Sequence, residues 1–115
     1  MSSGEKFLRK LYEGFNKREI ETVLSALDPD VHWANGMEGG FVEGREAVRE
    51  YWERQFPVIK SQVEPLAVAA DADGRQIVTV HQTVRNLEGN LLNESEVKHI
   101  FTIHNGLVTS FEIES

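Results

Sequence analysis

The fold is decided by the stretch LYEGFNKREIETVLSALDPDVHW, residues 11–33. Apolar side chains at its start continue a helical spacing, and Ser2 with Glu5 supplies a capping box upstream, so a first helix is predicted. We expect Asn16 to cap a second short helix. The apolar stripe of that helix is formed by Ile20, Val23, Leu24 and Leu27. Asp28-Pro29 is expected to end it, because the residue before a proline is pushed out of the helical region.

A short strand and a third helix are predicted next. Alternation indicates a strand from Val31 to Asn35, and the glycines at 36, 39 and 40 indicate a turn into Phe41-Val42. The segment GREAVREYW, residues 44–52, then has the helical period, with a glutamate in its first turn where the helix dipole favours an acid. The apolar face of this helix is formed by Val48, Tyr51, Trp52 and Phe56. Pro57 is expected to end it.

After Pro57 the period of the apolar residues changes to two, which predicts four long strands. They are expected at Ile59 to Asp71, Arg75 to Asn86, Leu92 to His104 and Leu107 to Glu114. Turn sequences separate them, at Asp73-Gly74, Glu88-Gly89-Asn90 and Asn105-Gly106. Pro65 marks a bulge or an edge position in the first of these strands. Three helices followed by an antiparallel meander predict an α+β fold.

Length and composition favour one small globular domain. The 115 residues suffice for a real core, and we expect a single domain over residues 1–115. The net charge of −7 opposes binding to nucleic acid or to an anionic membrane, so neither is an expected partner. There is no cysteine, and therefore no disulfide or thiol nucleophile. Because the sequence shows no secretory signal and no long apolar run, a cytoplasmic location is expected.

Alternation also sorts the side chains of the long strands into two faces. The face expected to meet the helices is formed on the last three strands by Val78, Val80, Gln82, Val84, Val97, His99, Phe101, Ile103, Leu107, Thr109, Phe111 and Ile113. Gln82, His99 and Asn35 are polar groups on this otherwise apolar surface. Each costs about 1–3 kcal/mol if it is buried without a partner. An internal network explains each one singly, whereas three together on one aromatic face favour a ligand pocket.

Other kinds of site lack their sequence patterns. The four histidines, at positions 32, 81, 99 and 104, form no HExxH or HxH motif, so no metal site is expected. There is no GxSxG elbow for a serine nucleophile, and the glycines at 36, 39 and 40 match no phosphate-binding loop. We therefore expect a protein that works without a cofactor.

The order of elements, with LYEGFNKREIETVLSALDPDVHW and GREAVREYW, resembles the SnoaL-like and ketosteroid-isomerase-like branch of the NTF2-like superfamily. The resemblance covers almost the whole chain. It implies an NTF2-like cone, in which three N-terminal helices pack in a strongly curved, mostly antiparallel sheet with an apolar pocket. It also implies a homodimer formed through the outer sheet face, which here carries Ile77, Thr79, His81 and Ile100. The superfamily includes isomerases, polyketide cyclases and dehydratases as well as members without catalysis, so the fold leaves function open.

At the three positions that correspond to the isomerase's catalytic residues, this chain carries different residue types. Its general-base aspartate corresponds to Asn35, and an amide takes up no proton at neutral pH. Its oxyanion-hole tyrosine corresponds to Leu11, with Tyr12 one position away and about 100° around the helix. Its second oxyanion donor, a carboxylic acid that an apolar site keeps protonated, corresponds to His99. The resemblance therefore does not imply a true 3-oxosteroid isomerase.

The favoured hypothesis is a cofactor-independent acid–base enzyme acting on a small, apolar, cyclic carbonyl or hydroxyl compound, of isomerase, cyclase or dehydratase type. His99 would serve as general base or acid, and Asn35 would orient the substrate or stabilise an oxyanion. The substrate is expected to contact Tyr12, Phe15, Trp33, Met37, Trp52, Phe56, Gln82, Val97, Phe101 and Phe111. The alternative is a small-molecule-binding or dimerisation module without chemistry.

Overall fold

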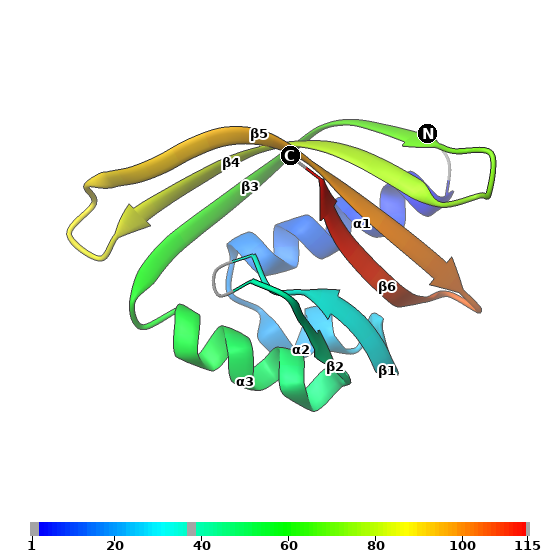
Figure 1. Cartoon of the computed structure of the whole chain (residues 1–115), viewed down its shortest axis with the longest axis horizontal. Helices are drawn as coiled ribbons and strands as arrows, with labels where there is room; N and C mark the ends of the chain where they lie inside the picture. Colours follow the sequence, from blue (N-terminus) through cyan, green and yellow to red (C-terminus); the bar gives the residue numbers. More distant parts are fainter. Residues whose placement is uncertain (1–2, 37–38, 115) are drawn as a thin grey trace.

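The structure is a computed structural model that describes residues 3–36 and 39–114. Three helices precede the long strands along the chain (Figure 1). The elements are α1 (Ser3–Asn16), α2 (Ile20–Leu24), β1 (Leu27–Ala34), β2 (Phe41–Glu43), α3 (Arg45–Gln55), β3 (Ile59–Ala70), β4 (Gln76–Asn86), β5 (Leu91–His104) and β6 (Leu107–Glu114). Ser2, predicted to belong to a capping box, lies outside the described residues.

All six strands form one sheet in the order β2-β1-β6-β5-β4-β3. The pair of β1 and β6 is parallel, and every other pair in this sheet is antiparallel. Figure 1 shows β3, β4 and β5 arching over the helices, with α1 beneath them and α3 farther from the arch. The predicted α+β class and the curved, mostly antiparallel sheet are confirmed.

The predicted hairpins of the meander are present. Asn105 and Gly106 both have positive φ, 53° and 78°, as a two-residue hairpin turn of the type favoured by Asn-Gly requires. Strand β3 shifts its register against β4 between Pro65 and Ala67, so the bulge predicted at the proline is confirmed. Helix α3 begins after Gly44, as predicted, and this glycine has a φ of 94°. That conformation strains any side chain and explains the glycine.

The prediction for the second helix was wrong at both ends. Helix α2 has only five residues and its N-cap position is Glu19. Asn16 instead ends α1, and its side chain forms two hydrogen bonds with the backbone of Val63 in β3, at 2.7 and 2.9 Å. Leu27 belongs to β1, which begins before the Asp28-Pro29 pair that was expected to end a helix. The side chain of Asn16, which local spacing assigned to a helix cap, thus bonds instead with a segment that is distant in the sequence.

The predicted facing of β6 was wrong at its start. Thr102 pairs with Ser110, but Ile103 pairs with Val108, so one extra residue lies in β6 between these pairs. Such a bulge inverts the facing of the residues beyond it. Val108 is consequently fully buried in place of Leu107, while Phe111 keeps its inward position.

One hydrophobic core joins the inner faces of α1, α2 and α3 to the sheet. Its fully buried members include Leu8, Leu24, Val48, Val78 and Phe101, which come from all three helices and from neighbouring strands. Among the residues that the structure describes, no helix is long and apolar enough to cross a membrane.

Candidate functional site

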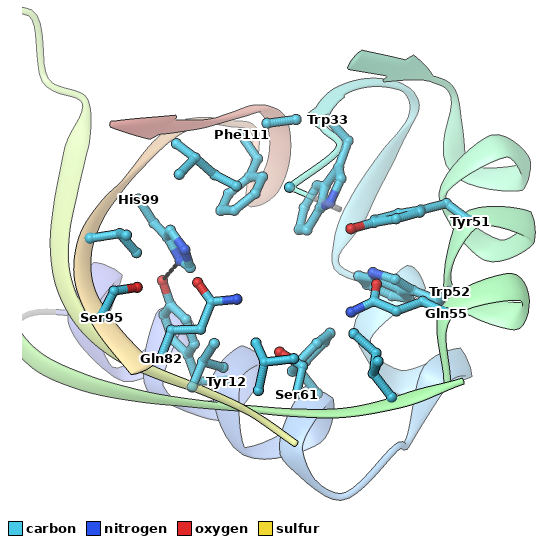
Figure 2. A pocket seen from close by; sticks show the side chains of 18 of the residues that line it. Tyr12, Trp33, Tyr51, Trp52, Gln55, Ser61, Gln82, Ser95, His99 and Phe111 are labelled. Carbon is cyan, nitrogen blue, oxygen red and sulfur yellow. Dashed lines mark hydrogen bonds between the residues drawn. The ribbon is translucent and has the colours of Figure 1, made fainter. Parts of the chain in front are cut away.

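A cavity of about 470 Å³ lies between α1, α3 and the concave face of the sheet. Figure 2 shows its walls: Tyr12, Gln82, Ser95 and His99 gather on one side, and Tyr51, Trp52 and Gln55 lie on the other. A volume of this size suits a small organic molecule, and a mostly apolar wall with a few polar groups is typical of ligand sites.

Most of the predicted site residues meet in this cavity. Those that line it are Tyr12, Phe15, Trp33, Trp52, Gln82, Val97, His99, Phe101 and Phe111. Phe56 does not line it; its ring stacks behind Trp52, with centroids 6.1 Å apart. Met37 lies outside the described residues. Alternation thus located several of the cavity-facing positions of the strands.

Asn35 is buried, with 6% of its surface exposed, but it is not among the residues that line the cavity. Its backbone closes the loop after β1: its N–H donates to the carbonyl of Gly40 at 2.9 Å, and its carbonyl accepts from the N–H of Gly39 at 3.0 Å. The neighbouring Ala34 and Gly36 do contribute to the cavity wall. The role in catalysis given to Asn35 therefore stays a prediction, without support from its position.

A buried pair of polar side chains forms one wall of the cavity. The hydroxyl oxygen of Tyr12, on α1, lies 2.7 Å from Nδ1 of His99, on β5 (Figure 2). The His99 ring is edge-on to Phe111 at 4.8 Å between centroids, and the Tyr12 ring is edge-on to Phe101 at 6.0 Å. Apolar rings therefore surround the two polar groups and hold them against each other.

Burial makes both members of this pair neutral. Loss of hydration lowers the pKa of His99 from 6.5 to about 4, because the imidazolium is the charged form. The same cause raises the pKa of Tyr12 well above its ordinary value of 10, because the phenolate is charged. At neutral pH the pair is therefore an imidazole and a phenol, and the proton between them lies either on the tyrosine oxygen or on Nδ1.

An aromatic wall continues from this pair to α3. Trp33 stacks on Phe111 with centroids 4.1 Å apart and meets Trp52 edge-on at 5.6 Å. Phe15 packs edge-on against Trp52 at 5.6 Å. These rings give the cavity an aromatic lining that suits an apolar ligand containing a ring.

Several lining residues were missed by the reasoning from sequence. They are chiefly Tyr51, Gln55, Ser61, Asn93 and Ser95. Gln55 lies one helical turn after Tyr51, so the helical period of α3 was the signal for it. Ser61 lies between the buried Ile59 and Val63 at a spacing of two, and Ser95 pairs with Gln82 across β4 and β5. The serines, Asn93 and Gln55 are polar and were not picked out by the apolar pattern, whereas Tyr51 was assigned only to the apolar face of α3.

Two histidines that pair with glutamates lie away from the cavity. His32 is 2.5 Å from a carboxylate oxygen of Glu43, and His81 is 3.2 Å from one of Glu94, all on half-exposed or exposed side chains. Within residues 3–36 and 39–114, no three histidine or acidic side chains lie close enough to hold a metal ion together.

Comparison with known proteins agrees with this architecture. An NTF2-like protein of unknown function from Burkholderia pseudomallei K96243 is 26% identical, with a TM-score of 0.85, over 99% of this chain and 91% of that one. TerC, co-crystallised with polyporic acid, is 27% identical, with a TM-score of 0.83 over 97% and 90% of the two chains.

A putative polyketide cyclase from Xanthomonas campestris pv. campestris shares the fold at 19% identity, with a TM-score of 0.76 over 95% of this chain and 87% of that one. No curated protein matches the sequence. The SnoaL-like domain family matches residues 8–111, which is nearly the whole chain. The protein therefore belongs to the SnoaL-like domain family, a group with the NTF2-like fold.

Proposed function

We propose that this protein is a cofactor-independent acid–base enzyme that acts on a small, apolar, cyclic carbonyl or hydroxyl compound. The observation that carries the proposal is the hydrogen-bonded Tyr12–His99 pair in the wall of an aromatic cavity. Structural neighbours described as putative polyketide cyclases and as an epoxide hydrolase/cyclase-like enzyme support a reaction of the cyclase or isomerase type. The compound co-crystallised with TerC supports a small-molecule ligand.

The Tyr12–His99 pair can act as acid and base at once. When Nδ1 of His99 carries the proton and donates to the Tyr12 oxygen, Nε2 has a free lone pair and the Tyr12 hydroxyl proton is available to a ligand. Nε2 has no hydrogen-bond partner among the described residues, and His99 borders the cavity. A carbonyl compound with its oxygen at Tyr12 and its α-carbon at Nε2 would meet both groups.

Transfer of protons around this pair would convert the ketone into its enol. Nε2 takes the proton from the α-carbon, Nδ1 gives its proton to the Tyr12 oxygen, and the Tyr12 hydroxyl proton moves to the carbonyl oxygen. The C–H electron pair becomes the new C=C bond, and the C=O π pair becomes the O–H bond. No imidazolium or phenolate forms, which suits a site where burial disfavours both. Reversal from the other face of the enol, or at a second carbon, would give isomerisation.

A true 3-oxosteroid isomerase is outside this proposal. That reaction resembles the present one in its enol intermediate, but the isomerase depends on a carboxylate base, and position 35 holds an amide outside the cavity lining. The base in this protein would instead lie on β5, at His99.

Exchange of α-protons in D₂O tests the proposal directly. A panel of cyclic ketones, including 4-phenylcyclohexanone and 1-tetralone, is first screened for binding by the fluorescence of Trp33 and Trp52, both of which line the cavity. For ketones that bind, NMR then follows deuterium incorporation at the α-carbon. We expect wild-type protein to accelerate exchange, and His99→Gln or Tyr12→Phe to lose about 100-fold or more of that acceleration.

A matched control is available on the same sheet. His81 lies on β4 with a half-exposed side chain that pairs with Glu94, so His81→Gln removes an imidazole without touching the cavity. It should exchange at the wild-type rate. Equal rates in wild type and His99→Gln would contradict the proposed chemistry. Binding of the ketones with exchange no faster than in buffer would favour the alternative, a binding module without catalysis.

The proposed homodimer is a separate question. Ile77, Thr79, His81 and Ile100 on the outer sheet face are only half-buried in the single chain, which supports a contact there. Sedimentation of wild type and of an Ile100→Glu variant would test it, because a dimer through this face should dissociate when a charge is placed on it.

A further inference from the structure

The carboxamide of Gln55 is a polar group in the cavity wall that the proposed proton transfer leaves unused. Gln55 is the last residue of α3, on the side of the cavity opposite the Tyr12–His99 pair (Figure 2). Its Oε1 atom is fully buried and has no hydrogen-bond partner among the described residues.

A buried acceptor without a partner opposes folding, and few such atoms remain in native proteins. At the wall of a ligand cavity, such an acceptor gains a hydrogen-bond partner when a ligand with a donor group binds. The terminal torsion of a glutamine is broad and roughly two-fold, so the carboxamide can turn its oxygen toward a ligand.

We propose that the carboxamide of Gln55 binds a hydroxyl group of the substrate, at the end of the molecule opposite the carbonyl oxygen held by Tyr12. The substrate class would then be a cyclic compound with a carbonyl at one end and a hydroxyl at the other. Only the assignment of the first oxygen rests on the proposed function. Contact of the second with Gln55 rests on the buried Oε1 and on its place across the cavity.

The chemistry of the amide favours a hydroxyl over other oxygen groups. A hydroxyl can donate to Oε1 and also accept from Nε2–H, whereas an ether or a carbonyl can only accept. The ring that carries the hydroxyl would lie beside Trp52, which precedes Gln55 by one helical turn and also lines the cavity.

Two matched series of ketones, which differ in length, test this contact. The longer is 4-phenylcyclohexanone with its 4-hydroxyphenyl and 4-methoxyphenyl analogues, and the shorter is 1-tetralone with its 6-hydroxy and 6-methoxy analogues. Dissociation constants are measured by calorimetry, without regard to turnover. In the series whose length suits the cavity, the hydroxy member should bind wild-type protein roughly tenfold more tightly than both other members.

Gln55→Met should abolish that preference, because methionine fills a similar volume without a strong acceptor. Gln82→Met is the matched control, since Gln82 is another carboxamide in the wall but lies on the Tyr12–His99 side (Figure 2). It should keep the preference for the hydroxy member. Gln55→Met should also unfold at no lower temperature than wild type, because the substitution removes an unpaired acceptor.

Three outcomes would overturn the assignment. They are methoxy members that bind as tightly as their hydroxy partners in both series, hydroxy members that bind no more tightly than the unsubstituted ketones in both series, and a preference that survives in Gln55→Met. The proposed function fails by a different measurement, when α-proton exchange is independent of His99. Loss of exchange with an intact hydroxyl preference would therefore refute the chemistry and leave the binding assignment standing.

Discussion

Replacement of His99 by glutamine should make the protein less sensitive to mild acid. Burial lowers the pKa of His99 from 6.5 to about 4 in the folded state. Between these two pH values the unfolded chain binds a proton at this position that the folded chain does not. The free energy of unfolding must therefore fall as the pH drops from about 6.5 to about 4, and His99 contributes no further loss below that range.

The magnitude follows from the two pKa values. At pH 7 His99 is almost wholly neutral in both states, and its titration contributes almost nothing. At pH 5 the unfolded chain is mostly protonated at this position while the folded chain is mostly not, which destabilises the fold by about 2 kcal/mol. The full difference of about 2.5 pH units corresponds to about 3 kcal/mol near pH 4.

The assay is urea denaturation of wild type and His99→Gln at pH 7, 6 and 5. The variant loses the hydrogen bond to Tyr12 and should be the less stable protein at pH 7, by about 1–3 kcal/mol. The gap between the two proteins should shrink by about 2 kcal/mol on going to pH 5, because only wild type carries the titration. Carboxylates titrate in both proteins, so their effect cancels in the comparison.

Two controls separate this effect from a general response to acid. His81→Gln keeps the buried His99 and should retain the loss of stability that His99 causes between pH 7 and pH 5. Tyr12→Phe keeps the buried imidazole and should retain the acid sensitivity. A constant difference between wild type and His99→Gln from pH 7 to pH 5 would refute the claim that His99 is neutral in the folded protein.

Three further substitutions test contacts and backbone conformations that hold the fold. Phe101→Ala should lower the free energy of unfolding by about 3–5 kcal/mol in urea, because Phe101 is 1% exposed; a loss below about 1 kcal/mol would contradict its place in the core. Asn16→Ala should cost about 1–3 kcal/mol and speed hydrogen exchange at the Val63 amide, whereas unchanged exchange would exclude that contact. Gly44→Ala should lower the melting temperature, with a cost of about 1 kcal/mol or more from its φ of 94°; an unchanged value would argue against that conformation.

Periodicity and turn chemistry were sufficient to predict most of the fold. The change from a helical period to a period of two after Pro57 marks where α3 gives way to β3, and Asn105-Gly106 has the positive φ angles that its sequence favours. Both signals are local. Asn16 was misassigned because its partner, the backbone of Val63, lies 47 residues away, so the local helix-capping rule had no access to it.

Many residues of the candidate site were predictable from the sequence, but the hydrogen bond that joins two of them was not. Alternation identified His99, and helical spacing identified Tyr12, but nothing in the sequence indicates that side chains 87 residues apart share a hydrogen bond. Alternation also placed Asn35 on the inner surface, although the structure leaves it outside the cavity lining, because β1 ends at Ala34 and the chain turns there. The alternation of side chains along a strand does not extend to the residue after its end.

The neutral state of the Tyr12–His99 pair bears on the amide at position 35. A carboxylate base is negatively charged before it accepts the proton. Once it has done so, the negative charge lies on the substrate oxygen, and the site needs hydrogen-bond donors that stabilise this oxyanion. Here burial moves the pKa of the imidazole down and that of the phenol up, so an ion pair between them is disfavoured from both sides. The chemistry open to such a pair is transfer of protons without separation of charge. That chemistry requires no carboxylate, and an asparagine in the place of the isomerase's aspartate is then compatible with catalysis.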